Sequence, residues 1–177
     1  MRSIDRWMSF PIVFFLTAVF LPAQTQASHP VTINIQSIAA LAIVGGNITL
    51  TVDSPASGGD PPDPVRDRSC FLQYTSTVGI GQTRSVSAAW GLTDDAPAGC
   101  RLRLRAVPES GEGVSSGGIR VKETAQSIIT EIGLCATGTG DSDGAQLRYT
   151  LRVNDVTSLV AGESRTVMVT FTLTDTS

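Results

Sequence analysis

Apolar and polar residues alternate along most of the chain after residue 30, and this alternation constrains the fold more than any other feature. A period of two places successive side chains on opposite faces of a strand, so each run has one apolar and one polar face. The pattern recurs at residues 31–35, 48–52, 72–74, 86–90, 102–106, 147–153 and 167–173. We therefore predict an all-β chain with antiparallel strands around one core.

Turn-forming residues separate the alternating runs. Segments rich in Gly, Pro, Ser or Asp lie at residues 45–46, 54–68, 79–81, 94–99, 108–118 and 138–144. Residues 124–132 also fit a short helix, but their β-branched side chains fit a strand equally well. The spacing of the breakers predicts a two-sheet, immunoglobulin-like antiparallel β-sandwich of about seven or eight strands.

Residues 1–27 have the organisation of an export signal. Arg2 and Arg6 precede a twelve-residue apolar run at 10–21, and the small residues Thr25 and Ala27 follow it. As a helix this run would span about 18 Å, less than a hydrocarbon core of about 30 Å. We expect residues 1–27 to be removed, so that a single domain at 28–177, without a membrane span, reaches the periplasm, the cell surface or the exterior of a bacterium.

The charge balance disfavours one class of partner. Without Arg2, Arg6 and Asp5 the chain retains 11 of its 13 basic and 15 of its 16 acidic residues, a net charge of −4. Nucleic-acid binding needs a concentrated positive surface, so we expect no nucleic-acid partner.

Three cysteines lie in the expected domain: Cys70, Cys100 and Cys135. In an oxidising compartment two of them would pair. Sequence alone allows three pairings. We favour Cys100–Cys135 with Cys70 free, because both lie where a strand-like run meets a Gly-rich turn, and Cys70–Cys100 is the second choice. Zinc binding is disfavoured, since the cysteines stand 30 and 35 residues apart and His29 is the only histidine.

The sequence contains no recognisable catalytic group. His29 follows the expected cleavage point, and Ser57 and Ser69 lie in irregular loops without a base nearby in the sequence. We therefore expect a non-enzyme without a cofactor. Asp141 and Asp143 resemble a fragment of a calcium loop, but a third oxygen donor and the terminal Glu are missing, so a hairpin loop is the simpler interpretation.

Arginines alternate with apolar residues in two runs. Arg101, Arg103 and Arg105 should share one strand face, and Arg148 and Arg152 should share another. If these strands are neighbours, the arginines form a basic stripe suited to the sulfate, phosphate or uronate groups of a glycan. A solvated face balanced by acids such as Glu123 is the simpler interpretation.

The first and last alternating runs are the cleanest in the chain. Residues 31–35 and 166–174 carry no charge, and the latter run consists almost wholly of Thr and apolar residues. A strand of this kind at an open edge invites pairing with another strand. It is therefore either covered within the fold or used for strand addition between subunits, and residues 31–35 could be the donor.

In organisation the chain resembles small exported β-sandwich subunits of bacterial surfaces and pili. The shared features are the signal, the early alternating segment, the few lysines and the closing run TVMVTFTLT. Segments like APAGCRLRL and LRYTLRV also make it similar to a loose group of uncharacterised bacterial secreted proteins. The chain ends Asp175-Thr176-Ser177 and lacks the penultimate tyrosine of chaperone–usher pilins.

These observations favour a non-enzymatic structural or adhesive protein, secreted or at the cell surface, such as a fimbrial or filament subunit. Its partners would be other copies of itself or surface-assembly proteins. The alternative is a periplasmic or extracellular module that binds a ligand or glycan.

Overall fold

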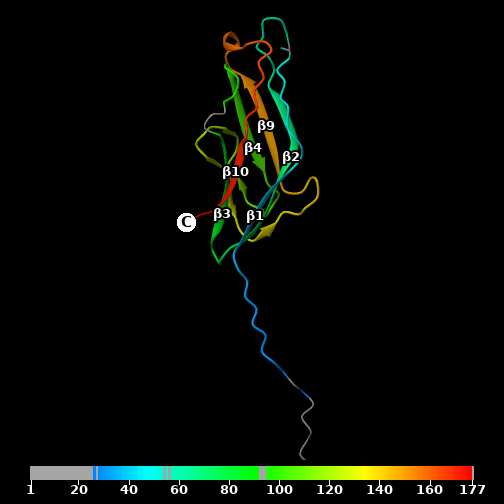
Figure 1. The fold of residues 1–177 in the computed structure, drawn as a ribbon, viewed down its shortest axis with the longest axis vertical. Helices are drawn as coiled ribbons and strands as arrows, with labels where there is room; N and C mark the ends of the chain where they lie inside the picture. The colour runs from blue at the N-terminus through cyan, green and yellow to red at the C-terminus, as the bar shows by residue number, and fades with distance from the viewer. Residues whose placement is uncertain (1–25, 27, 54, 56, 92–94, 177) are drawn as a thin grey trace, which may run out of the picture. The chain divides into compact units, whose positions relative to one another are not determined.

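The computed structural model describes residues 26, 28–53, 55, 57–91 and 95–176 of this all-β chain (Figure 1). It divides into two units, residues 1–34 and 35–177. The described part of the first unit has no regular secondary structure. The second contains two antiparallel sheets, as predicted, and one 3-10 turn, η1, at Val156–Ser158. The predicted export signal lies almost wholly outside the described residues, so it stays a prediction.

The larger sheet has the strand order β1-β2-β9-β4-β6, with β8 also paired to β2. Its strands are β1 (Ile38–Val44), β2 (Val65–Thr77), β4 (Cys100–Val107), β6 (Ile119–Arg120), β8 (Cys135–Ala136) and β9 (Ala145–Val153). The β4–β9 pairing is regular over its whole length, and β2 shifts register against β9 at a bulge between Asp67 and Cys70. We call this the large sheet.

The second sheet, called the small sheet, has the order β10-β3-β7-β5. Its strands are β3 (Thr83–Trp90), β5 (Val114–Ser115), β7 (Gln126–Ile132) and β10 (Val169–Thr176). Strand β7 resolves the ambiguity of residues 124–132, because the described chain there is a strand. Two irregularities interrupt the pairing of β3 with β7.

One cluster of buried hydrophobic side chains draws on both sheets. Leu72, Leu104 and Leu147 come from the large sheet, and all three are fully buried. Alternate residues of β4 and β9 are buried, as their sequence pattern predicts. Burying one such side chain contributes about 1.5–3 kcal/mol. The same alternation turns the remaining side chains of β4 and β9 outward.

Three N-terminal segments differ from the prediction. Strand β1 was not expected, because its sequence, IAALAIV, does not alternate. Residues 48–52 do alternate, and Ile48, Leu50 and Val52 pack against the core, but this segment forms no strand. Residues 31–35 also form no strand, and Val31, Ile33 and Ile35 are 70, 80 and 85% exposed.

Among the described residues, no helix is sufficiently long and apolar to cross a membrane.

A glycine fixes the start of β9 against β2. Gly144 has φ +94, and a Cβ at this position would lie 2.4 Å from the carbonyl oxygen of Leu72. Its neighbour Ala145 is the register partner of Leu72. Only glycine has both the backbone freedom and the lack of a side chain that this approach requires.

We predict that Gly144→Ala lowers the free energy of unfolding by about 2–4 kcal/mol, because it combines positive-φ strain with a backbone clash. Gly162→Ala is the matched control, since Gly162 has φ +82 but faces open space. The control should lose only about 1 kcal/mol. Urea denaturation measures both changes, and equal losses would contradict the close approach.

Candidate functional site

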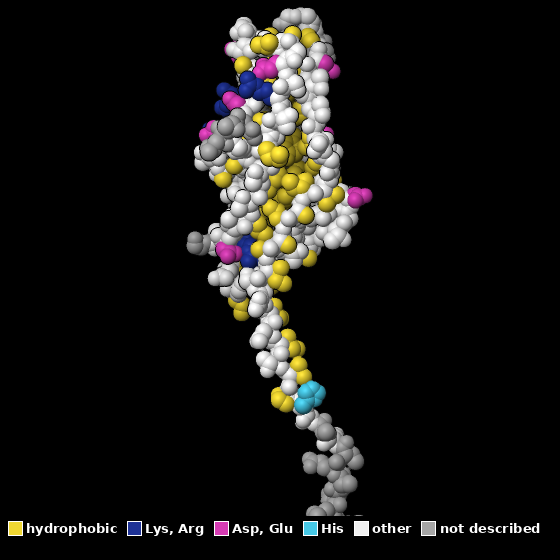
Figure 2. Space-filling view, in the orientation of Figure 1, with side chains coloured by type: hydrophobic (Ala, Val, Ile, Leu, Met, Phe, Trp, Pro, Cys, Tyr) yellow, Lys and Arg dark blue, Asp and Glu magenta, His cyan; other side chains and the backbone are white. Residues whose placement is uncertain are grey.

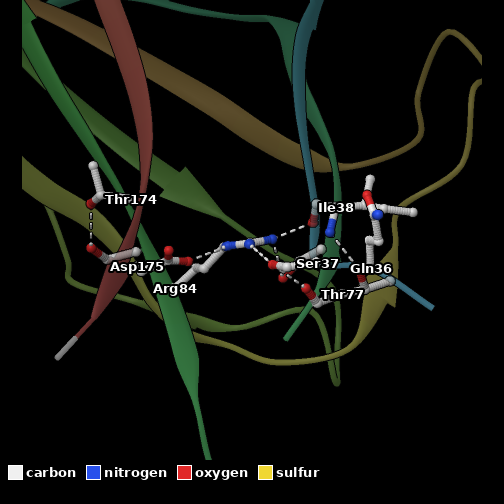
Figure 3. A network of polar contacts seen from close by, with 9 residues as sticks. Gln36, Ser37, Ile38, Thr77, Arg84, Thr174 and Asp175 are labelled. Carbon is white, nitrogen blue, oxygen red and sulfur yellow. Dashed lines mark hydrogen bonds and ion pairs between the residues drawn. The ribbon is translucent and has the colours of Figure 1, made fainter. Parts of the chain in front are cut away.

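A buried arginine joins the two sheets at one end of the molecule (Figure 3). Arg84 lies on β3 and is only 4% exposed. Its Nε donates to Asp175 Oδ1 on β10 over 2.7 Å, and its Nη2 donates to Ser37 Oγ over 2.6 Å. Its Nη1 donates to the carbonyl of Ile38 on β1 and lies 3.4 Å from Ser76 Oγ on β2. Arg84 therefore connects β3 and β10 with β1 and β2.

A threonine at the end of β2 holds the chain that enters β1. Thr77 Oγ1 donates to the carbonyl of Gln36 over 3.1 Å and accepts from the backbone N–H of Ile38 over 2.6 Å. Ser37 Oγ donates back to the Thr77 carbonyl over 3.0 Å. Residues 36–38 are thus anchored to the large sheet, next to Arg84.

The outer strands β1 and β10 each have an open edge. In the described part of the chain, β1 pairs only with β2 and β10 pairs only with β3. The two strands approach each other, and Arg84 bridges them. Unpaired backbone N–H and C=O groups at such edges accept a further strand.

Half-buried apolar side chains lie beside these edges, on β10 and on the segment that follows β1. They pack against the core but keep part of their surface in solvent. Figure 2 shows a continuous band of hydrophobic surface between β10 and the chain that leaves β1. We call this set the apolar strip: Ile48, Leu50, Val52, Val169, Phe171 and Leu173.

The outer face of the large sheet carries a dense field of arginines, which we call the arginine face. They come from β2, β9, β4 and β6, and their positions alternate with buried residues. The members are Arg66, Arg68, Arg101, Arg103, Arg105, Arg120, Arg148 and Arg152. The strands bearing Arg101, Arg103 and Arg105 and Arg148 and Arg152 are neighbours, which was the condition for a basic stripe.

The register places arginines directly opposite one another. Arg101 faces Arg152 and Arg105 faces Arg148 across β4 and β9, and Arg103 faces Arg120 across β4 and β6. Like charges at directly opposed positions destabilise a sheet.

No carboxylate in the described chain forms an ion pair with the arginine face. The ion pairs among the described residues, Arg84–Asp175 and Arg165–Glu163, involve none of its members. Arg103 Nη2 donates to the Gly118 carbonyl over 3.0 Å. The balancing acids that a solvated face would need, Glu123 among them, are therefore not paired with it.

Six of these arginines surround a hollow of about 290 Å³. Thr150, Gly118 and Tyr149 also line it, and the Tyr149 side chain is buried in the core. Burial raises the pKa of Tyr149 above its usual value, so the ring stays neutral beneath the arginines. The arginines around the hollow are Arg66, Arg68, Arg103, Arg105, Arg148 and Arg152.

The expected disulfide is not formed, and this corrects the prediction: Cys70, Cys100 and Cys135 are all free. Cys100 lies opposite Val153 and Cys70 opposite Leu147, both on β9, so about 20 Å of strand separates them. Cys135 lies opposite Ser76, about 20 Å along β2 from Cys70 and at the other end of the large sheet from Cys100. A disulfide needs Cα atoms within about 7 Å. Cys100 and Cys135 do lie at strand boundaries, as the sequence predicted, but these boundaries are at opposite ends of the large sheet.

Asp141 and Asp143, the candidate calcium ligands, lie in a turn that the Asp143 carboxylate stabilises. Asp143 Oδ2 accepts the backbone N–H of Gly140 over 2.7 Å, and a Cβ on Gly138 would overlap the Asp143 carboxylate. Neighbouring Asp141 lies exposed in the same turn. Among the described residues, no group of three or more His, Cys, Asp and Glu side chains could hold a metal ion.

Sequence reasoning missed Arg66, Arg68 and Arg84. The first two lie in a stretch that was expected to be a loop but begins β2 as a strand. Arg84 occupies the inward phase of the run that includes Val86, Ala88 and Trp90. A charge on the apolar phase of a strand is a signal that could have identified it.

No protein-family model, no curated protein and no solved structure matches this chain.

We predict that Arg84→Met lowers the free energy of unfolding by about 2–4 kcal/mol, because it removes a buried donor that serves acceptors from both sheets. Asp175→Asn should cost only about 1 kcal/mol or less, since the Asp175 side chain is 80% exposed. Arg165→Met, which removes an exposed arginine, is the control and should change little. Urea denaturation gives all three values. If Arg84→Met matched the control, the link between the sheets would contribute nothing.

We also predict that all three cysteines react as free thiols once the purified protein is unfolded without reductant. In the folded protein they should react slowly, because burial raises the pKa of Cys100 and Cys135 and disfavours the thiolate. Thiol titration with and without denaturant measures both. Fewer than three thiols in the unfolded protein would show a bond that the fold does not contain.

Proposed function

We propose that this chain is an exported, non-enzymatic structural subunit that assembles with copies of itself by strand addition. In this proposal the two sheets are the layers of an immunoglobulin-like β-sandwich that lacks one strand between β1 and β10. The observation that carries it is the pair of open edges with the apolar strip beside them. An added strand would supply both the missing hydrogen bonds and the missing apolar cover.

The donor is residues 31–35 of a second copy. Val31, Ile33 and Ile35 alternate with Thr32 and Asn34, so an extended segment presents all three apolar side chains on one face. These side chains are exposed, and the segment pairs with no strand in the described structure. It carries no charge that would have to be desolvated.

The free energy expected from adding the donor strand is of the same order as the cost of association. Burying three Val or Ile side chains is worth about 5–8 kcal/mol in gross terms. Association costs about 4–15 kcal/mol, so the apolar contacts alone offset only the lower part of this range. The backbone hydrogen bonds along the edge, each worth about 0.5–1.5 kcal/mol net, then favour the complex.

An ion pair ties the end of β10 to β3. Asp175 Oδ1 accepts from Arg84 Nε over 2.7 Å. In the proposal this ion pair holds β10 in place while its outer edge stays available. Export to the periplasm or cell surface, through cleavage of residues 1–27, is part of the same proposal.

We predict that the mature chain forms linear oligomers and that Ile33→Asp prevents this, because a carboxylate cannot enter the apolar strip. Ile80→Asp is the matched control, since Ile80 is fully exposed in the turn between β2 and β3. Light scattering coupled to size exclusion, with electron microscopy, distinguishes the species. Oligomers should be absent for Ile33→Asp and unchanged for Ile80→Asp.

A peptide test separates the donor from the acceptor. A synthetic peptide of residues 28–36 should bind a chain that begins at Ile35 and raise its melting temperature, whereas the same peptide with Ile33→Asp should not. A mature chain that stays monomeric at high concentration and is not stabilised by the peptide would contradict the proposal.

A further inference from the structure

The arginine face concentrates the positive charge of an acidic chain. From residue 28 onward the chain has 11 basic residues, and eight of them are members of this face. The chain as a whole carries a formal net charge of −3. Charge is thus separated onto one side of one sheet, where the local potential is opposite in sign to the net charge.

Like charges lie close together on this face, and among the described residues none of its arginines has an ion-pair partner. Three arginine pairs stand directly opposed across strands, and the ion pairs of the described chain leave them unbalanced. An anion held between such arginines would remove the repulsion. Destabilising arrangements of this kind are typical of binding sites, where stability is given up for function.

The geometry indicates an extended ligand with several anionic groups. Arg66, Thr150, Arg103 and Arg120 occupy consecutive register positions on β2, β9, β4 and β6. Three steps between neighbouring strands span about 14 Å. The hollow lies in this row, because its lining includes Arg66, Thr150 and Arg103. A single small anion would contact only part of the row.

The side chains present select among polyanions. Guanidinium groups bind carboxylate and sulfate groups through two parallel hydrogen bonds. Single-stranded nucleic acids also need aromatic platforms on which bases stack. None of the residues that line the hollow is an exposed aromatic, and Tyr149 is buried with its ring turned to the core.

We propose that the arginine face binds a linear acidic polysaccharide through its carboxylate or sulfate groups, with the chain lying across β2, β9, β4 and β6. This goes beyond the proposed assembly function and uses no residue of the apolar strip. Arg103 is central to the site, because its hydrogen bond to the Gly118 carbonyl orients the guanidinium at the edge of the hollow.

The test uses a polyuronate and a sulfated polysaccharide as probes, with neutral dextran and single-stranded DNA of similar length as comparisons. Titration calorimetry on the mature chain should show binding to one or both acidic polysaccharides and none to dextran. Affinity should fall steeply between about 50 and 200 mM salt, since exposed charges are screened over about 10 Å at 0.1 M. The stronger of the two probes identifies whether carboxylate or sulfate is preferred.

The decisive variant is Arg103→Gln/Arg105→Gln/Arg148→Gln. It should weaken binding by about 30-fold or more, because several charge-assisted hydrogen bonds are lost. Its melting temperature should stay the same or rise, because the opposed pair Arg105 and Arg148 no longer repels. Arg165→Gln, which lies outside the face, should leave both binding and stability unchanged.

A second triple variant, with lysine at the same three positions, keeps the charge but removes the planar fork. It should bind more weakly than the natural chain and more tightly than the glutamine variant. No binding to either acidic polysaccharide, equal binding by the glutamine variant, or tighter binding to single-stranded DNA would overturn the proposal. Repeating the titration on the assembly-deficient Ile33→Asp chain keeps the outcome independent of strand addition.

Discussion

The rest of the structure depends on how a buried guanidinium connects two sheets. Arg84 extends from β3 of the small sheet and donates to acceptors on β10, on β1 and at the residue before β1. A buried charge is tolerated only when its hydrogen bonds are satisfied, so these partners must stay together. Asp175, its only carboxylate partner in the described chain, is largely exposed. The neutral acceptors at β1 and β2 therefore contribute most of the stabilisation of the buried charge. One side chain therefore links the two outer strands, in addition to the core against which both strands pack.

The two outer strands are linked by Arg84 but are not paired with each other. Arg84 bridges β1 and β10 through side-chain and carbonyl contacts, whereas the two strands do not pair with each other. Beyond the link, the chain that follows β1 packs half-buried side chains against the core without forming a strand. The apolar strip is thus the place where the molecule has core-facing residues but no paired backbone to cover them.

Alternation in the sequence predicted the strands that have one face in the core and one in water. It identified β3, β4 and β9 well, because in each the buried phase is continuous. It missed β1, an edge strand that is apolar throughout, and it predicted strands at 31–35 and 48–52, which form no strand in the structure. The alternation of apolar and polar residues predicts which side chains can face a core. It does not predict whether another strand lies alongside to pair with the backbone. The structure contains no disulfide for the same reason, since the strand ends that carry Cys100 and Cys135 lie at opposite ends of the large sheet.

Strand addition and polysaccharide binding are compatible because they use different parts of the sheets, and assembly would strengthen polysaccharide binding. Adding a strand consumes backbone edges, whereas the arginine face lies on the outward side chains of β2, β9, β4 and β6. Each copy in an assembly would therefore keep its arginines in solvent. A linear polyanion that spans several copies converts each later contact into an intramolecular one, which raises overall affinity by about 10²–10⁴ without any new contact. Weak binding of the polysaccharide by each copy would then be enough for tight binding by the whole assembly.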